Sequence, residues 1–255
     1  MANPKPIDQD KDTPIKLIKP KKLWTFCIII GAFFWAAGII LWLQKGFDEA
    51  ALFYFNPMRI EMAPIVRASK WLSAYGMAAI TTILILYLLG SKLSKALDAT
   101  QTIYFYTICS FGLSGIAGDL IKLLINRPRP AALYGDKILA LSDAVSSAIP
   151  SGHATKSIAL VLPFILLVGH SKWIHKGVKI LIGFIALGVC FSRIVLGAHY
   201  VSDVLAGVGT ALIGLPLTML FANIPLSKMK QEQLPRVTFV WGFLLFFLTI
   251  VLILI

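Results

Sequence analysis

The sequence predicts an all-α fold, a polytopic transmembrane helix bundle of six to seven spans. Of its 255 residues, 58% are hydrophobic and 14% are charged, whereas soluble domains carry about 25% charged residues. The apolar residues also gather into runs long enough to cross a bilayer, which takes roughly 20 residues per helix. Both observations indicate an integral membrane protein and exclude an ordinary soluble domain.

The first apolar run, 23–43, is too long for the core of a signal peptide and lacks a small-residue cleavage site, so we expect a retained span. Further spans are expected at 76–95, 100–125, 154–171, 178–196, 200–223 and 237–255. Nothing polar follows the run at 237–255, and the sequence therefore leaves the number of spans at six or seven.

The segments outside these runs differ in composition. Residues 1–22 carry four prolines among lysines and aspartates, which predicts a disordered cytoplasmic tail. The remainder, 23–255, is expected to form a single membrane domain. Within it, 47–75 mixes aromatic and charged residues and is expected to lie as short amphipathic pieces at the headgroups, and 131–149 is a candidate lid.

The net charge of +12 does not indicate a nucleic-acid partner, because the basic residues are scattered between apolar runs and form no basic stripe. They indicate topology instead. With the N-terminus inside, the cytoplasmic segments carry the larger share of lysine and arginine, as the positive-inside rule requires. In this orientation, three polar motifs at the edges of the spans all face outward.

The first of these motifs pairs His199 with Asp203, four residues apart at the expected start of a span. On a helix, this spacing places both side chains on one face, where the carboxylate can accept the imidazole N–H and fix the tautomer. The other ring nitrogen is then free to act as a nucleophile or base. Taken alone, the motif fits a buried pair that only joins two helices better than it fits a catalytic one.

The second motif, Pro150-Ser151-Gly152-His153, directly precedes the run 154–171. Ser151 is a candidate N-cap, and the free N–H groups of a first helical turn bind phosphate readily. Gly152 lets the backbone approach a ligand closely. An ordinary capped helix with a surface histidine is the alternative for this motif alone.

Positive charge comes from Lys122, Arg129 and Arg193. An arginine pairs two phosphate oxygens with its planar fork and a lysine acts as a point charge, so the three together predict an oxyanion clamp. Taken alone, Lys122 is also compatible with snorkelling or with an ion pair to Asp119 one turn earlier. Arg129 and Arg193 alone are also compatible with interfacial anchors. We assign Arg127 to that structural role, because Pro128 is expected to turn it away from its neighbour.

In order, the three motifs read Lys-x6-Arg-Pro, Pro-Ser-Gly-His and Ser-Arg-x5-His-x3-Asp, all within 122–203. This arrangement resembles the type 2 phosphatidic acid phosphatase (PAP2) superfamily, which includes bacterial membrane lipid phosphatases and the vanadium haloperoxidases. Outside 122–203 the resemblance is topological only, and a seventh span would exceed the six usual for the membrane members. No defining position departs from the pattern: Lys122, Arg129, Pro130, Pro150, Ser151, Gly152, His153, Ser192, Arg193, His199 and Asp203.

The resemblance implies a phosphatase that needs no metal or other cofactor. His199 would attack phosphorus to give a phosphohistidine, and Asp203 would stabilise the imidazolium that forms. His153 would protonate the leaving oxygen and then activate water. The resemblance also implies a bacterial inner membrane location, with the site facing the periplasm or exterior. The groups that would hold the phosphate are Lys122, Arg129, Arg193 and the N–H groups of Ser151 and Gly152.

One further residue, Lys156, lies one turn after His153 on the same expected helix face. An ammonium at this depth is costly unless it meets an anion, so Lys156 is a candidate for binding a second phosphate or another acidic part of a substrate headgroup. An internal ion pair with Asp119 or Asp143 is the alternative.

The sequence does not choose the substrate among undecaprenyl diphosphate, phosphatidylglycerophosphate, phosphatidate and a phosphate of lipid A, nor does it predict an oligomeric state. Transfer of the phosphate to another lipid remains open beside hydrolysis. Two rival classes use the same residues. A non-haem iron site would take His153, His199 and Asp203 as ligands, although three nearby cations disfavour a metal dication. A non-enzymatic transporter of anionic lipid would need paired broken helices, which the sequence does not show.

Overall fold

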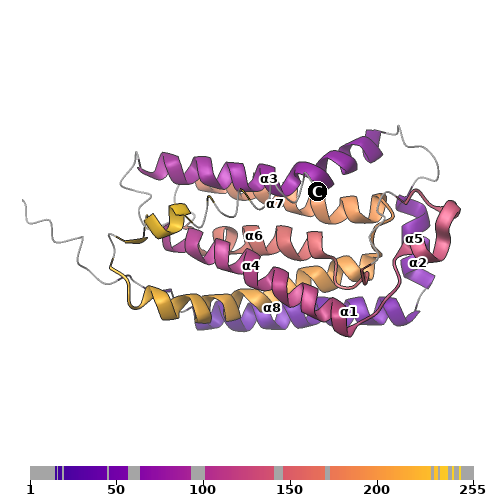
Figure 1. Cartoon of the computed structure of the whole chain (residues 1–255), viewed down its shortest axis with the longest axis horizontal. Coiled ribbons are helices and arrows are strands. Elements are labelled where there is room, and N and C mark those ends of the chain that lie inside the picture. The colour runs from indigo at the N-terminus through magenta and orange to yellow at the C-terminus, as the bar shows by residue number, and fades with distance from the viewer. Residues whose placement is uncertain are drawn as a thin grey trace, which may run out of the picture.

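The computed structural model describes residues 15, 17–18, 20–44, 46–56, 64–92, 101–140, 146–169, 173–230, 233–234, 236–240, 243 and 247. All secondary structure elements in this part of the chain are helical, which confirms the all-α class. Long helices run along one axis and make a bundle (Figure 1). The elements are α1 (Lys21–Gln44), α2 (Gly46–Phe55), α3 (Pro64–Lys92), α4 (Gln101–Leu124), α5 (Pro130–Tyr134), the 3-10 helix η2 (Gly135–Lys137), α6 (Gly152–Leu167), α7 (Trp173–Val195) and α8 (Val201–Leu226).

Five helices in the described residues are long and apolar enough to cross a membrane, namely α1, α3, α4, α7 and α8. The sixth apolar helix, α6, has only 16 residues. It packs against α4, α7 and α8, and most of its residues are buried. A helix enclosed by other helices does not need to match the thickness of the lipid, which explains why α6 is shorter than the run 154–171 predicts.

Three expectations about the spans need correction or lie outside the structure. The span expected at 76–95 begins at Pro64, so 64–75 belongs to one continuous helix of 29 residues and is not a separate interfacial piece. Within 47–75 a short helix, α2, does form, with two acidic residues in its first turn, whereas 57–63 lies outside the described residues; the position of α2 at the headgroups stays a prediction. The seventh span expected at 237–255 falls mostly outside the described residues.

The described end of the N-terminal segment packs on the bundle, although the composition of 1–22 predicts disorder. Ile15 is buried in a cluster with residues of α1, α4 and α8, and the backbone N–H of Ile18 donates to the hydroxyl of Tyr106 at 3.4 Å. Apolar side chains between the prolines and lysines therefore find a docking surface that composition alone does not reveal.

Glycine permits the close approach of α1 and α8. A Cβ added at Gly31 would lie 2.9 Å from the carbonyl oxygen of Gly209, and one added at Gly209 would lie 2.7 Å from the carbonyl of Gly31. Small residues at such crossings let helix backbones pack directly in a membrane. This contact anchors α8, whose first turn carries part of the polar motifs.

At one end of the bundle (right in Figure 1), α2 and α5 lie beside the ends of the long helices. The buried side chain of Asn56 joins this region together. Its Nδ2 donates to the carbonyls of Leu139 and Val195 at 3.0 and 2.9 Å, and its Oδ1 accepts from the N–H of Leu139 at 2.8 Å. The end of α2, the segment after η2 and the end of α7 are thereby held in one place.

Candidate active site

The three motifs meet at this end of the bundle because of the directions in which their helices run. Lys122 lies in the last turn of α4 and Arg193 in the last turn of α7, whereas His153 and Asp203 lie in the first turns of α6 and α8. Electrostatic interactions link His199 with Lys122, Arg129 and Arg193, and link His153 with His199 and Arg193. The structure therefore brings the predicted residues into one cluster.

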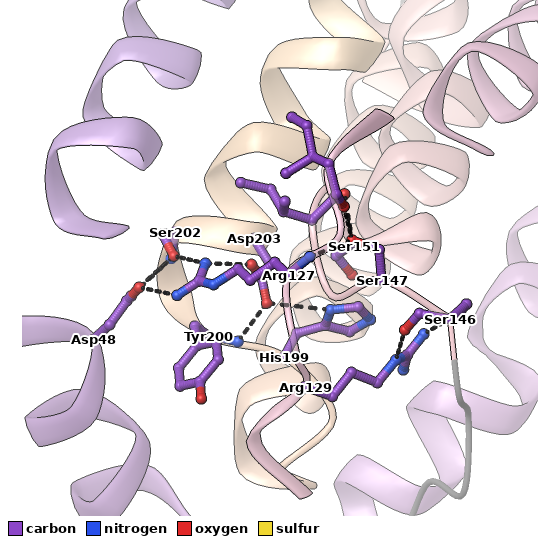
Figure 2. A network of polar contacts seen from close by, with 12 residues as sticks. Asp48, Arg127, Arg129, Ser146, Ser147, Ser151, His199, Tyr200, Ser202 and Asp203 are labelled. Carbon is purple, nitrogen blue, oxygen red and sulfur yellow. Dashed lines mark hydrogen bonds and ion pairs between the residues drawn. The ribbon is translucent and has the colours of Figure 1, made fainter. Parts of the chain in front are cut away.

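His199 is held next to Asp203, but not in the way the spacing predicts. Because α8 begins at Val201, His199 lies in the loop before the helix and not on its face. Its Nδ1 lies 3.4 Å from Oδ2 of Asp203, a contact whose geometry falls short of a hydrogen bond (Figure 2). The same Oδ2 accepts the N–H of Tyr200 at 2.9 Å. The carboxylate is thus fixed by the backbone and faces Nδ1, which leaves Nε2 for chemistry.

Gly197 makes the loop before His199 possible. Its φ of +64° lies in the left-handed region, and a Cβ there would lie 2.7 Å from the carbonyl oxygen of Leu139. A residue with a side chain would meet both backbone strain and a collision. This glycine turns the chain from the end of α7 so that His199 reaches Asp203.

Ser151 occupies the expected N-cap position of α6, yet its hydroxyl makes no capping hydrogen bond. Its backbone N–H donates to the carbonyl of Asp203 at 2.9 Å. This N–H, predicted to hold phosphate, thus already has a partner in the protein. The hydroxyl has the opposite status: Ser151 Oγ is buried and has no hydrogen-bond partner among the described residues.

The cationic groups are positioned by polar contacts with neighbouring helices and loops. Arg129 donates from Nε to the carbonyl of Ser146 and from Nη2 to the Ser146 hydroxyl, both at 2.9 Å. Arg193 donates to the hydroxyl of Ser73 on α3, while its Nε is buried without a partner in the described part of the chain. These contacts hold each guanidinium in place and leave part of its donor capacity unused.

Lys122 reaches the start of α6. A Cβ added at Gly152 would lie only 3.1 Å from Lys122 Nζ, so the glycine leaves the space that the ammonium approaches. Lys122 also pairs with Asp119 at 3.3 Å, and Lys156 lies 3.6 Å from the other oxygen of the same carboxylate. The side chain of Asp119 is 56% exposed. Asp119, one of the two ion-pair partners considered for Lys156, is therefore in contact with it; Asp143 lies outside the described residues.

The electrostatic surroundings of His199 favour its neutral form. The side chain is 2% exposed, and burial penalises the imidazolium. Arg193, Arg129 and Lys122 add positive charge nearby, so the pKa of His199 lies well below the usual value of 6.5. A neutral imidazole with a free nitrogen is the form that can attack an electrophile.

Arg127 is the residue of this site that sequence reasoning placed wrongly. It is 6% exposed and donates from Nη1 to Oδ1 of Asp203 at 2.5 Å and from Nη2 to Oδ2 of Asp48 at 2.9 Å (Figure 2). Its guanidinium also lies over the ring of Tyr200, 4.3 Å from the centroid. Arg127 is thus buried at the site beside the catalytic candidates, and the turn at Pro128 directs it toward Asp203 instead of to the membrane interface.

The ligand set of the iron alternative is not assembled in this structure. Within the described residues, no group of three or more histidine, cysteine or acidic side chains is placed to hold a metal ion. The oxygens of Asp203 are occupied by Arg127 and by the N–H of Tyr200. The cluster instead has the composition of an anion site, with several cations around two histidines.

Comparison with known proteins gives consistent matches. Residues 103–225, which contain all three motifs, match the model of the PAP2 superfamily. The chain is 27% identical over 162 residues to lipid A 1-phosphatase of Rhizobium johnstonii and 35% identical over 108 residues to phosphatidylglycerophosphatase B of Bacillus subtilis. These alignments cover 57% and 40% of this chain and 63% and 50% of the two relatives, so the chain matches less than two thirds of their lengths.

Among solved structures, the chain is similar to a transmembrane PAP2 type phosphatidylglycerolphosphate phosphatase from Bacillus subtilis, with a TM-score of 0.54 and 25% identity. This likeness covers 81% of the present chain and 96% of the other. Fold and site together define an integral membrane protein that resembles the PAP2 phosphatases. Residues 103–225, which carry the three motifs, match the PAP2 superfamily that these motifs predict, and the fold of the chain resembles that of a PAP2 phosphatase.

Proposed function

We propose that this protein is a membrane lipid phosphatase that works through a phosphohistidine on His199. One observation carries the proposal: Ser151 Oγ and Arg193 Nε are buried in the cationic cluster and lack partners among the described residues. Buried polar groups are normally hydrogen-bonded, and an unpaired one requires an explanation. A phosphate group bound between α6 and α7 supplies an acceptor for both.

In the proposed reaction, Nε2 of His199 attacks phosphorus as the bond to the leaving oxygen breaks. Asp203 stabilises the imidazolium that forms, and His153 delivers a proton to the leaving oxygen. His153 then takes a proton from water as that water attacks the phosphohistidine, which releases inorganic phosphate and restores His199. Such sites contribute most of their catalysis by stabilising the charge that develops on the phosphoryl oxygens. The groups proposed to bind these oxygens are Lys122, Arg129, Arg193, Ser151 Oγ and the N–H of Gly152.

The proposed substrate is an anionic lipid that carries a terminal phosphate. The relatives named above are a lipid A 1-phosphatase and a phosphatidylglycerophosphatase. Both names describe removal of a phosphate from a lipid, and the present cluster lies at the ends of apolar helices where a lipid headgroup would arrive. We propose that the site lies on the outer face of the membrane, the orientation that the loop charges favour under the positive-inside rule, and that this membrane is a bacterial inner membrane, as the resemblance implies.

A phosphate-release assay tests this function. Purified protein in detergent is incubated with lipid A, phosphatidylglycerophosphate, phosphatidate and undecaprenyl diphosphate, in the presence of EDTA. We expect release of inorganic phosphate from at least one lipid, inhibition by vanadate, and no release by His199→Ala. Phosphate found on a second lipid would show a phosphotransferase. Lipid binding without any release or transfer would support the transporter class and overturn the proposal.

Labelling of cysteines tests the orientation. In a variant that lacks Cys27, Cys109 and Cys190, single cysteines are placed at Asp136, which is exposed beside the site, and at Ser227, which is exposed at the far end of α8. A membrane-impermeant thiol reagent applied to intact cells should label the first and spare the second. The opposite pattern would place the site on the cytoplasmic face.

A further inference from the structure

Asp48, in the first turn of α2, is joined to the catalytic pair through Arg127. Its carboxylate is 1% exposed and accepts three hydrogen bonds: from Nη2 of Arg127 at 2.9 Å, from the N–H of Ser202 at 3.0 Å, and from the Ser202 hydroxyl. Arg127 contributes its other terminal nitrogen to Asp203. The chain of contacts therefore runs from α2, through one guanidinium, to the carboxylate that faces His199 (Figure 2).

The two oxygens of Asp203 have separate partners in this arrangement. Oδ1 accepts from Arg127 at 2.5 Å, whereas Oδ2 accepts from the N–H of Tyr200 and faces Nδ1 of His199. With Oδ1 held, the carboxylate cannot rotate about its Cβ–Cγ bond without breaking a short charged contact. Arg127 therefore fixes the oxygen that is presented to the imidazole.

Arg127 is itself held from several directions. Nη1 also donates to the hydroxyl of Ser202 at 2.6 Å, and the guanidinium is stacked over Tyr200 and lies 5.2 Å from the ring centroid of Trp42. The two buried carboxylates share this one cation, so Asp48 and Asp203 both depend on Arg127 for compensation of their charge. Asp48 completes this pairing from a helix outside the three motifs.

Asp48 also satisfies the start of α8. The N–H of Ser202 belongs to the first turn of α8, where backbone donors have no partner within the helix, and Asp48 accepts it across the helix boundary. A carboxylate at a helix N-terminus is electrostatically favourable. Through this contact, α2 fixes the position of the same turn that carries Asp203.

We propose that Asp48 and Arg127 are positioning residues for the phosphoryl-transfer step, acting through Asp203 to orient His199. The inference rests on the proposed phosphohistidine function. Neither side chain touches the substrate in this assignment. Asp48 places Arg127, Arg127 selects the free oxygen of Asp203, and that oxygen sets the direction of the His199 ring.

The principal test is Asp48→Asn in the purified enzyme, with Glu49→Gln as the matched control. The control removes the same charge from the adjacent residue of α2, which makes no contact with Arg127 in the described hydrogen bonds and ion pairs. We expect Asp48→Asn to lower kcat about 10- to 100-fold, the scale on which loss of a residue that orients a histidine acts in other sites. Glu49→Gln should keep the KM and the melting temperature of the wild type. Asp48→Asn should also keep the wild-type KM.

A double-mutant cycle tells positioning apart from a merely structural role. If Asp48 acts through Asp203, Asp48→Asn should change kcat by about twofold or less in an Asp203→Asn background, because the pathway is already broken there. Residual turnover of an activated aryl phosphate makes the comparison measurable. Full additivity of the two losses would overturn the inference, as would an Asp48→Asn enzyme with wild-type kcat.

Arg127→Lys covers the case in which Asp48→Asn does not fold. Lysine keeps the buried positive charge but lacks the fork that contacts Asp48 and Asp203 at once. We expect a folded enzyme with reduced kcat and unchanged KM, and unaltered kcat would overturn the inference. Two different results separate this inference from the proposed function. If the proposed function is wrong, the wild-type enzyme releases no phosphate from any lipid. If only the inference is wrong, the wild type is active and the variants have the same kcat.

Discussion

The two sides of His199 differ in how completely their polar atoms are partnered. Behind the ring, Arg127, Asp48, Ser202 and Asp203 form a buried network in which the charged groups contact one another. Among the groups proposed to bind phosphate, here called the front side, Ser151 Oγ and Arg193 Nε are buried without partners in the described part of the chain. A saturated network resists rearrangement, while an unsaturated one has capacity for a ligand. The difference separates the part of the site that positions from the part that binds.

Removal of the residue between the two sides should have the largest effect. His199→Ala takes away the proposed nucleophile, and loss of an essential nucleophile costs roughly 10⁶-fold in kcat in other hydrolases. We expect neither turnover nor a labelled phosphoenzyme when the substrate carries radioactive phosphate. A phosphoenzyme that still forms in this variant would assign the covalent step to another residue.

His153, on the front side, should show its role through the leaving group. A general acid contributes about 10²–10⁴-fold, and less where the leaving oxygen needs no proton. His153→Ala should therefore lose much more activity on a lipid phosphate than on an aryl phosphate of an acidic phenol. Equal losses on the two substrates, measured as kcat/KM, would argue against His153 as the acid.

The two sides can be compared directly by the same substitution in each. Arg193→Met removes a front-side donor and should lower kcat/KM about 10²–10³-fold, the usual cost of losing one donor to developing charge. Arg127→Met removes the cation between Asp48 and Asp203 and should lower the free energy of unfolding by about 3–5 kcal/mol, because two carboxylates remain buried. Equal changes in thermal stability for the two variants would contradict the division between binding and positioning.

Lys156 tests whether the front side also binds a second acidic group of the substrate. If it holds a second acidic group, Lys156→Met should weaken turnover of a lipid diphosphate more than that of phosphatidate, by about 1–3 kcal/mol in kcat/KM. Asp119→Asn is the control, because the contact of Lys156 with this exposed carboxylate is the competing role. Equal losses on both lipids, together with a lower melting temperature, would show that Lys156 is structural.

The smallest effect concerns pH. The pKa of His199 is lowered by burial and by the cations around it. At pH values just below 6.5, the imidazole therefore stays neutral in the folded enzyme, whereas an unfolded histidine, with a pKa of about 6.5, is protonated. Protons then bind the unfolded state preferentially, so this residue makes stability decrease as pH falls below about 6.5. The acid limb of kcat/KM, corrected for substrate ionisation, should also lie below that pH, and a limb above it would contradict the lowered pKa.

Much of the binding side could be predicted from sequence. The motif residues Lys122, Arg129, Arg193, His153 and His199 gather as expected, because short spacings next to apolar runs fix the helix ends that carry them. The backbone details could not be predicted. The N–H of Ser151 has a partner in Asp203, across more than 50 residues of sequence, and this depends on how α6 packs on α8.

The contacts of Arg127 and Asp48 could not be predicted from the sequence. Arg127 precedes a proline, and the turn expected there predicts a place at the membrane interface. Its carboxylate partners instead lie 79 and 76 residues away in the sequence. The signal that was available is the acidic residue Asp48 in a short segment rich in aromatic residues, since a carboxylate there needs a buried cation. Pairings between distant segments follow from the assembled bundle, and no periodicity records them.

The enclosed position of α6 separates catalysis from the thickness of the bilayer. Its 16 residues rise only about 24 Å, less than the ~30 Å of a typical hydrocarbon core. Lipids of a different chain length press on the helices that face them, which respond by tilting or by local adjustment of the bilayer. The helices that face lipid here include α1 and α3, with exposed side chains such as Phe33 and Leu86, so a difference between helix length and bilayer thickness acts on them. A helix surrounded by protein keeps His153 at one depth relative to its neighbours while the membrane around it thins or thickens.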